Sequence, residues 1–575
     1  TTSDLGEVEN IFSSIKKSGQ AGLGVIGVSG NCKGISLTWK EGSVLALIGG
    51  FVTEDYLKEK IVELLKEGTE LIVLDYKALL HFVEEVREYE SQIQDVGIQA
   101  YLLNPLQSAY DYEDIARDYL RQMLPSRKEI CGKKAIEEVF EAEEEKTVQM
   151  AAYLSYVPFH AYPLVLEKLK EQEMEELYLT IERPTVATLY DMEKYGITVE
   201  KDALKEYGDQ LIGRIEELEQ NIYEKAGKTF NINSPKQLAN VLFDELNLSS
   251  GGKKRSTSAD VLEKLRGKHP IVEDILEYRK ISKVSSTYID GLKKHIRPDQ
   301  KIHTSFNQTM TQTGRLSSSE PNLQNISIRD ELGKEIRKAF VAEEGYQLLS
   351  ADYSQIELRM LAHMADEDHM IKAFNEGLDI HTKTATLIFD CLPEEVDEHR
   401  RRIAKTVNFG IVYGQTEFGL SSQLNITRKE AGEFMKMYFE SYPKIHEYMN
   451  QLIEFCKENG YVETLFHRRR EIPEINDKNF MTREFGKRAA MNAPIQGSAA
   501  DLIKIAMLKM DKALKDENIK SKMLLQIHDE LIFLVPDEEL DLMKKLVKET
   551  MESAMKLKVP LKASISIGKS WYEAK

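Results

Sequence analysis

Cysteine is scarce in this chain, and long apolar runs are missing. Only four cysteines occur among 575 residues, at positions 32, 131, 391 and 456, and no two are spaced for a zinc site. A disulfide framework is excluded at this density, so we expect four reduced thiols, as in cytosolic proteins. No apolar run approaches the roughly 18 residues of a membrane-spanning helix, and the N-terminus has no signal-peptide pattern.

An excess of positive charge is also missing, because the net charge is −18. The charge is unevenly spread, however. Residues 400–488 carry 16 Lys and Arg against 12 Asp and Glu, and residues 251–301 carry 13 against 7. Two basic segments in an acidic protein predict a polyanion held in a cleft, although charge runs also occur simply on solvated surfaces.

The composition is that of an ordered multidomain protein. A 42% hydrophobic share can build cores for roughly three or four folding units. Thr in place of an initial Met predicts a piece of a longer protein. Residues 1–166 alternate strands and helices, which predicts an α/β domain. We expect strands at Gly24–Val28, Ile35–Trp39, Val44–Ile48 and Glu70–Asp75, helices at Thr53–Glu67 and Lys77–Tyr89, and an exposed acidic helix at Glu137–Glu145.

Beyond residue 167 the pattern becomes helical. Residues Lys201–Ala226 place apolar side chains at helical spacing over more than six turns. Ser234 and Pro235 are typical of the cap and first residue of a further helix. Gly251–Ser258 is glycine-rich and basic, which predicts a mobile tip between helices. Long helices with a basic tip suit an arm that lies along a nucleic-acid duplex.

Two segments are candidates for a metal site. An apolar strand runs into Asp352, before a helix that starts near Ser354, and a carboxylate at a strand end can either hold a hard cation or cap the helix. In Met523–Val535, two apolar runs flank His-Asp-Glu with Asp529 at its centre, which predicts a β-hairpin with an acidic turn. That turn is either solvated or functional. Two aspartates converging from two strands would make a two-metal site for phosphoryl transfer.

A basic and aromatic row follows in the sequence. Arg401, Lys405 and Phe409 are four residues apart, so a helix would carry them on one face. A guanidinium, an ammonium and a ring in a row would grip a triphosphate and pack on its sugar or base. Tyr413 continues the row beside Gly414, which would allow a hinge. An exposed basic helix with its rings in the core is the alternative interpretation.

Arginines and side-chain amides form a further pattern. Arg488, Asn492 and Gln496 are again four apart, and Pro494 among them predicts a kink or a helix boundary. Such amides suit the edges of bases in the minor groove, but ordinary amides on a helix surface would give the same sequence pattern. Arg315, in the segment Thr313–Ser318, is a further candidate of this kind.

In this order, five segments resemble the motifs of family A DNA polymerases. Asp352–Arg359, Arg401–Gly414 and Gln526–Glu530 are similar to the three polymerase motifs, and Thr313–Ser318 and Asn492–Gln496 are similar to duplex-contacting motifs. The resemblance, from about Ile181 to Lys575, implies an α/β and α+β multidomain fold with a right-hand polymerase and an N-terminal ribonuclease H-like 3′–5′ exonuclease-type domain. The implied domains are 1–166 (exonuclease-like), 167–300 (connecting helices and thumb), 301–370 (palm), 371–494 (fingers) and 495–575 (palm).

The resemblance also implies a role for each residue. Asp352 and Asp529 would ligate two Mg²⁺ with the Tyr353 carbonyl, and Glu530 would lie beside the primer end. Lys405 would act in catalysis as well as in binding. The residues implied to bind the incoming dNTP are Arg401, Lys405, Phe409, Tyr413, Gln355, Glu357 and His381. Those implied to contact primer–template DNA are Arg315, Arg488, Asn492, Gln496 and His528.

The activity implied is template-directed DNA synthesis in replication and repair, by a monomeric bacterial protein of the cytoplasm and nucleoid that does not bind membranes. One rival is a single-subunit RNA polymerase, which Glu357 argues against because the family uses that Glu against the sugar 2′-OH. A second rival is an inactive DNA-binding scaffold, which the intact Asp352, Asp529, Arg401 and Lys405 argue against.

By the same resemblance, the N-terminal domain is predicted to have lost its proofreading nuclease. That activity needs four carboxylates around two metals, but the candidate strand Gly24–Gly30 has no acid. Leu79 stands where the third ligand belongs, and 146–166 contains no acid for the fourth. Displaced carboxylates such as Asp75 or Glu145 are the alternative. Asp95 and Tyr101–Pro105 fit the pattern of the fold, so we expect the domain to be retained for structure.

Overall fold

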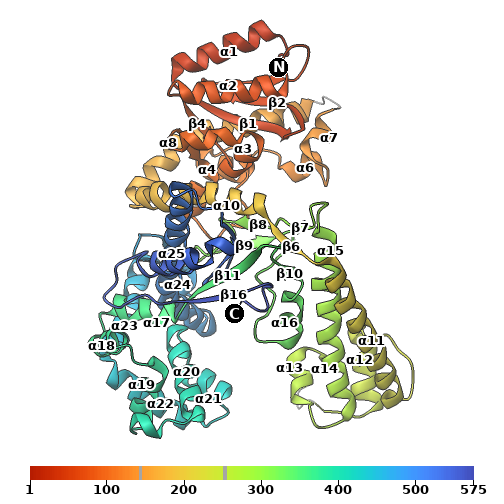
Figure 1. The fold of residues 1–575 in the computed structure, drawn as a ribbon, viewed down its shortest axis with the longest axis vertical. Coiled ribbons are helices and arrows are strands. Elements are labelled where there is room, and N and C mark those ends of the chain that lie inside the picture. Colours follow the sequence, from red (N-terminus) through yellow and green to blue (C-terminus); the bar gives the residue numbers. More distant parts are fainter. Residues whose placement is uncertain (142–144, 250–254, 575) are drawn as a thin grey trace.

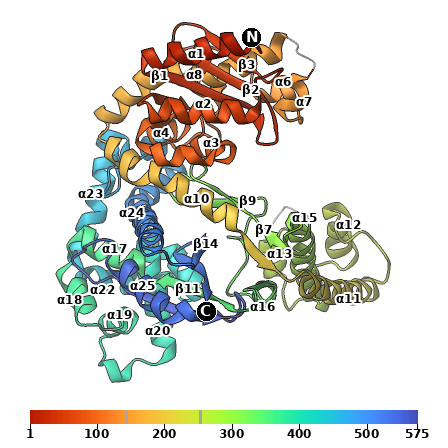
Figure 2. The ribbon, with the colours of Figure 1, turned by 45° about the horizontal axis from the view of Figure 1, so that its top comes forward.

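The computed structural model describes residues 1–141, 145–249 and 255–574. An N-terminal α/β unit lies above a central sheet, and two helical lobes extend from that sheet on opposite sides (Figure 1). Figure 2 shows helix α10 (Arg183–Tyr195) leading from the N-terminal unit toward the rest of the chain. One hydrophobic core joins the central sheet to both helical lobes, and the N-terminal unit has a core of its own.

The N-terminal sheet has the strand order β3-β2-β1-β4-β5. Strand β1 pairs antiparallel with β2 and parallel with β4. Gly24 in β1 lets helix α8 approach closely, because a Cβ there would lie 2.4 Å from the Leu154 Cβ. The strands are β1 (Gln20–Val28), β2 (Asn31–Thr38), β3 (Ser43–Leu47), β4 (Glu70–Val73) and β5 (Ile93–Asp95). The main helices are α1 (Leu5–Ser18), α2 (Glu54–Lys66), α3 (Tyr76–Phe82), α4 (Val96–Leu103) and α8 (Glu145–Glu171).

The four expected strands are confirmed, while two expected helices need correction. The helix expected to reach Tyr89 ends as α3 at Phe82, because Val83 is extended, and a 3₁₀ segment (Glu84–Gln92) follows. The acidic stretch is not simply an exposed helix: it includes α7 (Ile136–Phe140), in which Glu137 is buried. Its residues 142–144 lie outside the described residues.

The first helical lobe is the predicted arm. Helix α11 (Lys201–Ala226) has the expected bounds, and its buried residues Leu204, Leu211 and Leu218 follow the predicted spacing as it packs on α14. Ser234 caps α12 (Pro235–Ala239) as expected, by accepting a hydrogen bond from the Gln237 backbone N–H. The other helices of this lobe are α13 (Ala259–Lys264), α14 (Pro270–Lys283) and α15 (Gly291–His295).

The central sheet has the order β14-β15-β11-β16 and is antiparallel throughout. The predicted hairpin is present as β14 and β15, which are joined through His528 and Asp529. Register pairs Asp352 of β11 with Glu530 of β15. The elements of this part are β11 (Tyr346–Tyr353), β14 (Lys522–Ile527), β15 (Glu530–Pro536), β16 (Ala563–Gly568), α17 (Ile356–Ala365) and α25 (Leu540–Glu552).

The second helical lobe leads into the longest helix of the chain, α24 (Phe480–Asp516). Of the two outcomes predicted at Pro494, a kink or a helix boundary, the boundary is excluded, because α24 continues through that residue. Pro494 is buried and flanked by buried Ala493 and Ile495, so tertiary packing holds the helix where a backbone hydrogen bond is lost. The lobe consists of α18 (Asp368–Asn375), α19 (Ile380–Ile388), α20 (Glu398–Val412), α21 (Glu417–Leu424), α22 (Arg428–Ser441) and α23 (Pro443–Asn459).

All four cysteines are free thiols. Within the described residues, no helix combines the length and apolarity that crossing a bilayer requires.

Candidate active site

Three carboxylates meet at one end of the central sheet. Asp352 is the penultimate residue of β11, and Asp529 lies in the turn that enters β15. The backbone joins the two strands here, since the Tyr353 N–H donates to the Asp529 carbonyl over 3.2 Å. Asp352 does not cap the following helix, because Gln355 occupies the cap position of α17 with a left-handed φ of 53°. The predicted convergence of two aspartates from two strands is therefore present.

The acidic group is electrostatically unbalanced. Desolvation, followed by repulsion from Glu530 and Asp529, raises the pKa of Asp352 to about 7. Burial also raises the pKa of Asp529, and the charge of Arg315 only partly opposes it. The Glu530 carboxylate accepts a hydrogen bond from Ser350, two residues before Asp352 on β11. Carboxylates gathered without matching cations are typical of a site that binds a positive ion.

The donor atoms at this end fit a hard divalent cation. Two carboxylates and the carbonyl of Tyr353 are oxygen donors, as Mg²⁺ prefers, and Mg²⁺ usually fills its remaining positions with water and substrate phosphates. No cluster of three or more His, Cys, Asp or Glu side chains placed to hold a metal occurs in the described part of the chain. The pair Asp352 and Asp529 thus fits an ion shared with a phosphate substrate better than a closed protein cage.

Helix α20 carries the predicted basic row. Its cap is Asp397, which accepts from the Arg400 backbone N–H over 2.8 Å. Arg401 binds Asp379, with 3.0 Å between its Nη2 and the carboxylate. Lys405 is exposed and has no carboxylate partner among the residues described. The row therefore offers at least one cation free to meet an anionic ligand.

A hydrogen-bond chain that the sequence did not reveal fixes His381 beside this row. The Thr384 hydroxyl donates to the side-chain oxygen Oδ1 of Asn408 over 3.0 Å. The side-chain nitrogen Nδ2 of Asn408 therefore faces His381 Nδ1, at 2.9 Å. Burial and the nearby Arg401 lower the pKa of His381 to about 4. The ring is therefore neutral at pH 7 with its proton on Nε2, and it lies 5.7 Å from the Phe409 ring. The one sequence signal for this position is Asp379, a helix-cap residue two positions before His381, which predicts a helix start there.

A buried carboxylate separates the acidic group from α20. Glu357 on α17 is 4% exposed, and the Arg315 guanidinium binds it over 2.9 Å. Burial raises the pKa of Glu357, while Arg315 and a hydrogen bond from Tyr413 lower it. Tyr413, which caps the C-terminus of α20, is 47% exposed. The three side chains thus link the sheet end to the end of α20.

The remaining predicted contact residues lie around this link. Asn492 donates to the Val412 carbonyl over 3.0 Å, so its amide joins α24 to α20 rather than standing free. Arg488 is beside Gly414, whose added Cβ would come within 3.3 Å of the Arg488 Cα. Gln496 is half-buried, and His528 is exposed with a left-handed φ of 55°. Arg488, Asn492 and Gln496 thus lie along α24, and His528 lies next to Asp529 in the β14–β15 turn.

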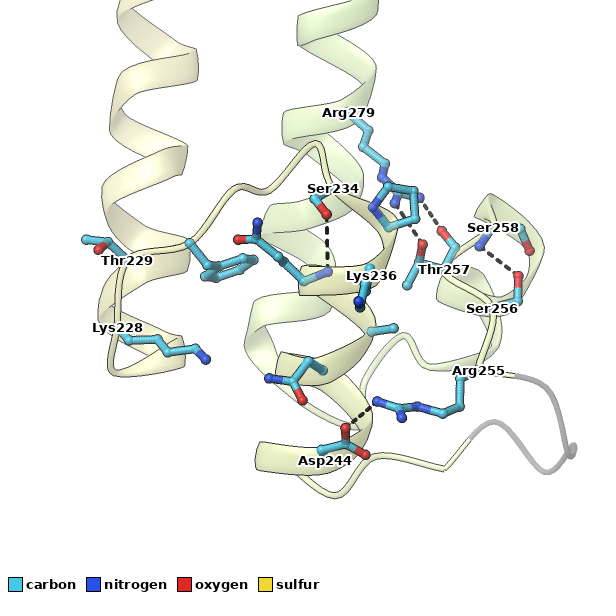
Figure 3. A pocket seen from close by; sticks show the side chains of 15 residues that line it. Lys228, Thr229, Ser234, Lys236, Asp244, Arg255, Ser256, Thr257, Ser258 and Arg279 are labelled. Atoms are coloured by element: carbon cyan, nitrogen blue, oxygen red, sulfur yellow. Dashed lines mark hydrogen bonds and ion pairs between the residues drawn. The ribbon is translucent and has the colours of Figure 1, made fainter.

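The arm ends in a cavity of about 1110 Å³ that is lined by residues within 228–244 and 255–258 and by Arg279 of α14 (Figure 3). Arg279 donates to the Thr257 carbonyl, Arg255 pairs with Asp244, and Lys228 and Lys236 also line the cavity. Residues Gly251–Lys254 of the predicted mobile tip lie outside the described residues. The described part of the tip closes one side of the cavity and leads into α13 through the cap Ser258.

The N-terminal unit has a separate cleft of about 1210 Å³ where a nuclease centre would be expected. Of the carboxylates that line it, Asp75 caps α3, Glu193 binds Lys77 over 2.7 Å, and Glu137 is buried on α7. Asp95 is buried and caps α4, and burial together with Asp75 raises its pKa to about 8. Leu79 also lines this cleft, in the place predicted for a lost ligand.

The fold and the site together have the right-hand architecture of polymerases, with a palm sheet, helical fingers and thumb, and a ribonuclease H-like unit at the N-terminus. The pattern described as DNA polymerase family A matches residues 201–573. The chain belongs to DNA polymerase family A. The predicted fold class and family are confirmed.

Individual relatives agree with this assignment. The chain is 48% identical to DNA polymerase I of Geobacillus stearothermophilus over 495 residues, which cover 85% of this chain and 56% of that protein. It is 48% identical to DNA polymerase I of Bacillus subtilis (strain 168) over 486 residues, covering 84% and 55%. The chain thus spans about half the length of the curated relatives it matches. A solved structure of the POL domain of Pol1 from M. smegmatis, in complex with DNA primer-template and dNTP, superposes with a TM-score of 0.87 at 34% identity, covering 99% of both chains.

Proposed function

We propose that this chain is a template-directed DNA polymerase that adds dNTPs to a primer 3′-OH by two-metal-ion phosphoryl transfer. The observation that carries the proposal is the meeting of Asp352 and Asp529 at the end of adjacent strands, where the pKa of each is raised. Such a pair is suited to bind cations that a polyphosphate substrate completes. We extend the proposal to a monomeric enzyme of bacterial DNA replication and repair, acting in the cytoplasm on nucleoid DNA.

The side chains would divide the work by position. Mg²⁺ bound at Asp352 and Asp529 would lower the pKa of the primer hydroxyl and offset charge on the phosphates. Arg401 and Lys405 on α20 would align the triphosphate, and the neutral His381 would donate a hydrogen bond from its Nε2–H to a phosphate oxygen. Tyr413, at the flexible end of α20, would occupy the place of the templating base until the fingers close.

The remaining roles concern the duplex and the sugar. Glu357, fixed by Arg315, would stand against C2′ of the incoming sugar, and Gln355 at the start of α17 would contact the same nucleotide. Arg488, Asn492, Gln496 and His528 would contact the primer–template near the reacting end, and Glu530 would lie beside the primer terminus. The exposed and half-buried positions of these side chains around the acidic group support this arrangement.

Replacing either aspartate tests the proposal. Asp352→Ala or Asp529→Ala should lower primer extension by about 10³-fold or more, because a metal-binding carboxylate supplies several kcal/mol of transition-state stabilisation. Duplex binding in a gel-shift assay should survive. Asp541→Ala, at an exposed position of α25, is the matched control and should extend primers normally. Near-normal turnover in either site variant would refute the assignment, and an rNTP-only activity of the unaltered chain would favour an RNA polymerase.

We also propose that the N-terminal unit performs no 3′–5′ proofreading. The support is the cleft described above, where Leu79 replaces a ligand and Asp75 and Asp95 serve as helix caps. Without ligands, hydrolysis loses the group that generates its nucleophile. A 3′-mismatched primer incubated with the chain and Mg²⁺, without dNTPs, should stay intact. Trimming that persists in an Asp352→Ala/Asp529→Ala preparation and is lost in Asp75→Asn would show that displaced carboxylates substitute.

A further inference from the structure

Four charged side chains form a closed cluster between the N-terminal unit and the palm. Glu182, Arg468, Asp501 and Lys504 are each no more than 5% exposed at the side chain. Arg468 Nη2 binds Asp501 over 2.6 Å and also binds Glu182, and Lys504 Nζ binds Glu182 over 2.7 Å. Two anions balance two cations, and Gln308 adds a hydrogen bond to the other Glu182 oxygen at 2.9 Å. Full pairing is what allows charges to remain in such a buried place.

The cluster touches the turn that carries Arg315. Lys504 Nζ donates to the Gly314 carbonyl over 2.6 Å. Gly314 has a left-handed φ of 91°, and an added Cβ would lie 2.6 Å from Arg468 Nε. The backbone of this turn is therefore pressed against Arg468 and held by Lys504, so its path depends on the cluster.

A tyrosine of the N-terminal unit holds the same turn from the other end. Tyr101 on α4 is 1% exposed, and its hydroxyl donates to the Thr311 carbonyl over 2.6 Å. Thr311 in turn donates from its own hydroxyl to the Arg315 carbonyl over 2.6 Å. Tyr101 belongs to the segment Tyr101–Pro105, which fits the exonuclease pattern although the metal ligands do not.

We infer that the N-terminal unit is kept as a positioning scaffold for the polymerase site: Tyr101, with Glu182 acting through Lys504, fixes the 311–315 turn so that Arg315 meets Glu357 and the primer. The inference rests on the function proposed above. Tyr101, Glu182 and Lys504 are positioning residues, because they reach the nucleotide only through Arg315. The contact from Arg315 to Glu357, at 2.9 Å, completes the path from the N-terminal unit to the sugar of the incoming nucleotide.

Tyr101→Phe removes only the tyrosine hydroxyl that donates to the Thr311 carbonyl of the turn, and Tyr110→Phe is its matched control. Tyr110 packs edge-on against Tyr101 at 5.8 Å, and its hydroxyl donates to the Asn104 carbonyl over 2.5 Å, within the N-terminal unit. Each substitution costs one buried hydrogen bond, so a purely structural effect should be similar in both. Single-nucleotide extension by the full chain would be measured for dNTP and rNTP, in the unaltered and the Arg315→Ala background.

We expect Tyr101→Phe to lower kcat/KM for dNTP about threefold to tenfold and to raise the rNTP/dNTP ratio, with no such change in Tyr110→Phe. In the Arg315→Ala background the effect of Tyr101→Phe should vanish, because its path runs through that side chain. Equal effects in the two tyrosine variants, or an undiminished effect after Arg315→Ala, would overturn the inference while leaving the polymerase proposal intact. Full activity of Arg315→Ala would overturn the inference together with the proposed role of Arg315.

Discussion

At the scale of single residues, Glu357 is the side chain whose environment best explains a choice between substrates. It is buried, so a sugar hydroxyl brought against it would lose water and meet a filled space. Arg315 fixes its carboxylate, which leaves little freedom to move aside. Discrimination between two sugars that differ by one hydroxyl then becomes a steric and desolvation effect of one carboxylate.

Glu357→Ala should therefore raise the rNTP/dNTP efficiency ratio about tenfold, because it opens space beside C2′. It should also slow dNTP addition, since Arg315 loses its partner. Glu357→Gln keeps the shape and should retain most of the discrimination. Steady-state extension with single rNTPs and dNTPs measures the ratio and the rate of dNTP addition. An unchanged ratio in Glu357→Ala would exclude the proposed role of Glu357 against the sugar 2′-OH.

At the scale of elements, the pairing of α19 with α20 depends on a neutral histidine. The pKa of His381 is about 4 in the folded chain against 6.5 ordinarily, so the unfolded chain takes up a proton first as the pH falls. The stabilisation is complete above about pH 6.5 and is lost as the pH falls toward 4. Protonation would place a hydrogen on Nδ1, where the Asn408 amide now donates.

The free energy of unfolding should thus fall on going from pH 7.5 to pH 5, with about 2 kcal/mol of the fall due to His381. Urea unfolding of His381→Gln at both values should show a correspondingly smaller difference. His399→Gln, at an exposed histidine of α20, should keep the full pH dependence. An equal pH dependence in all three proteins would contradict the buried, neutral state of His381.

Elements with strong local signals could be predicted from the sequence. The bounds of α11 followed from helical spacing, and the β14–β15 hairpin from two apolar runs around His-Asp-Glu. The helix boundary allowed at Pro494 is absent because propensity describes an isolated helix, whereas α24 is held by its neighbours. The positions of Asp352 and Asp529 needed the family resemblance as well as the strand ends. The cluster of Glu182, Arg468, Asp501 and Lys504 had no local signal, because Glu182 and Arg468 are distant in sequence from the α24 residues that they meet in the tertiary fold.

At the scale of the whole molecule, that cluster joins parts of the chain that have separate hydrophobic cores. Asp501→Ala should lower the free energy of unfolding by about 3–5 kcal/mol, because Arg468 would keep its charge without its main partner. Asp516→Ala, in an exposed pair with Lys512 on the same helix, should stay within about 1 kcal/mol of the unaltered chain. Chemical denaturation followed by circular dichroism compares the two, and equal losses would show that the cluster adds no more than a surface ion pair.

The position of Glu182 has a consequence for how such a gene can change over time. It ends the segment Tyr178–Glu182, which joins the N-terminal unit to α10. A chain shortened past residue 182 would leave Arg468 and Lys504 with one buried anion, Asp501. Substitutions that erase a nuclease centre leave this pairing untouched, whereas a deletion that reaches Glu182 breaks it. Under the proposed function, single substitutions could therefore remove nuclease ligands one at a time while the palm keeps its buried ion pairs.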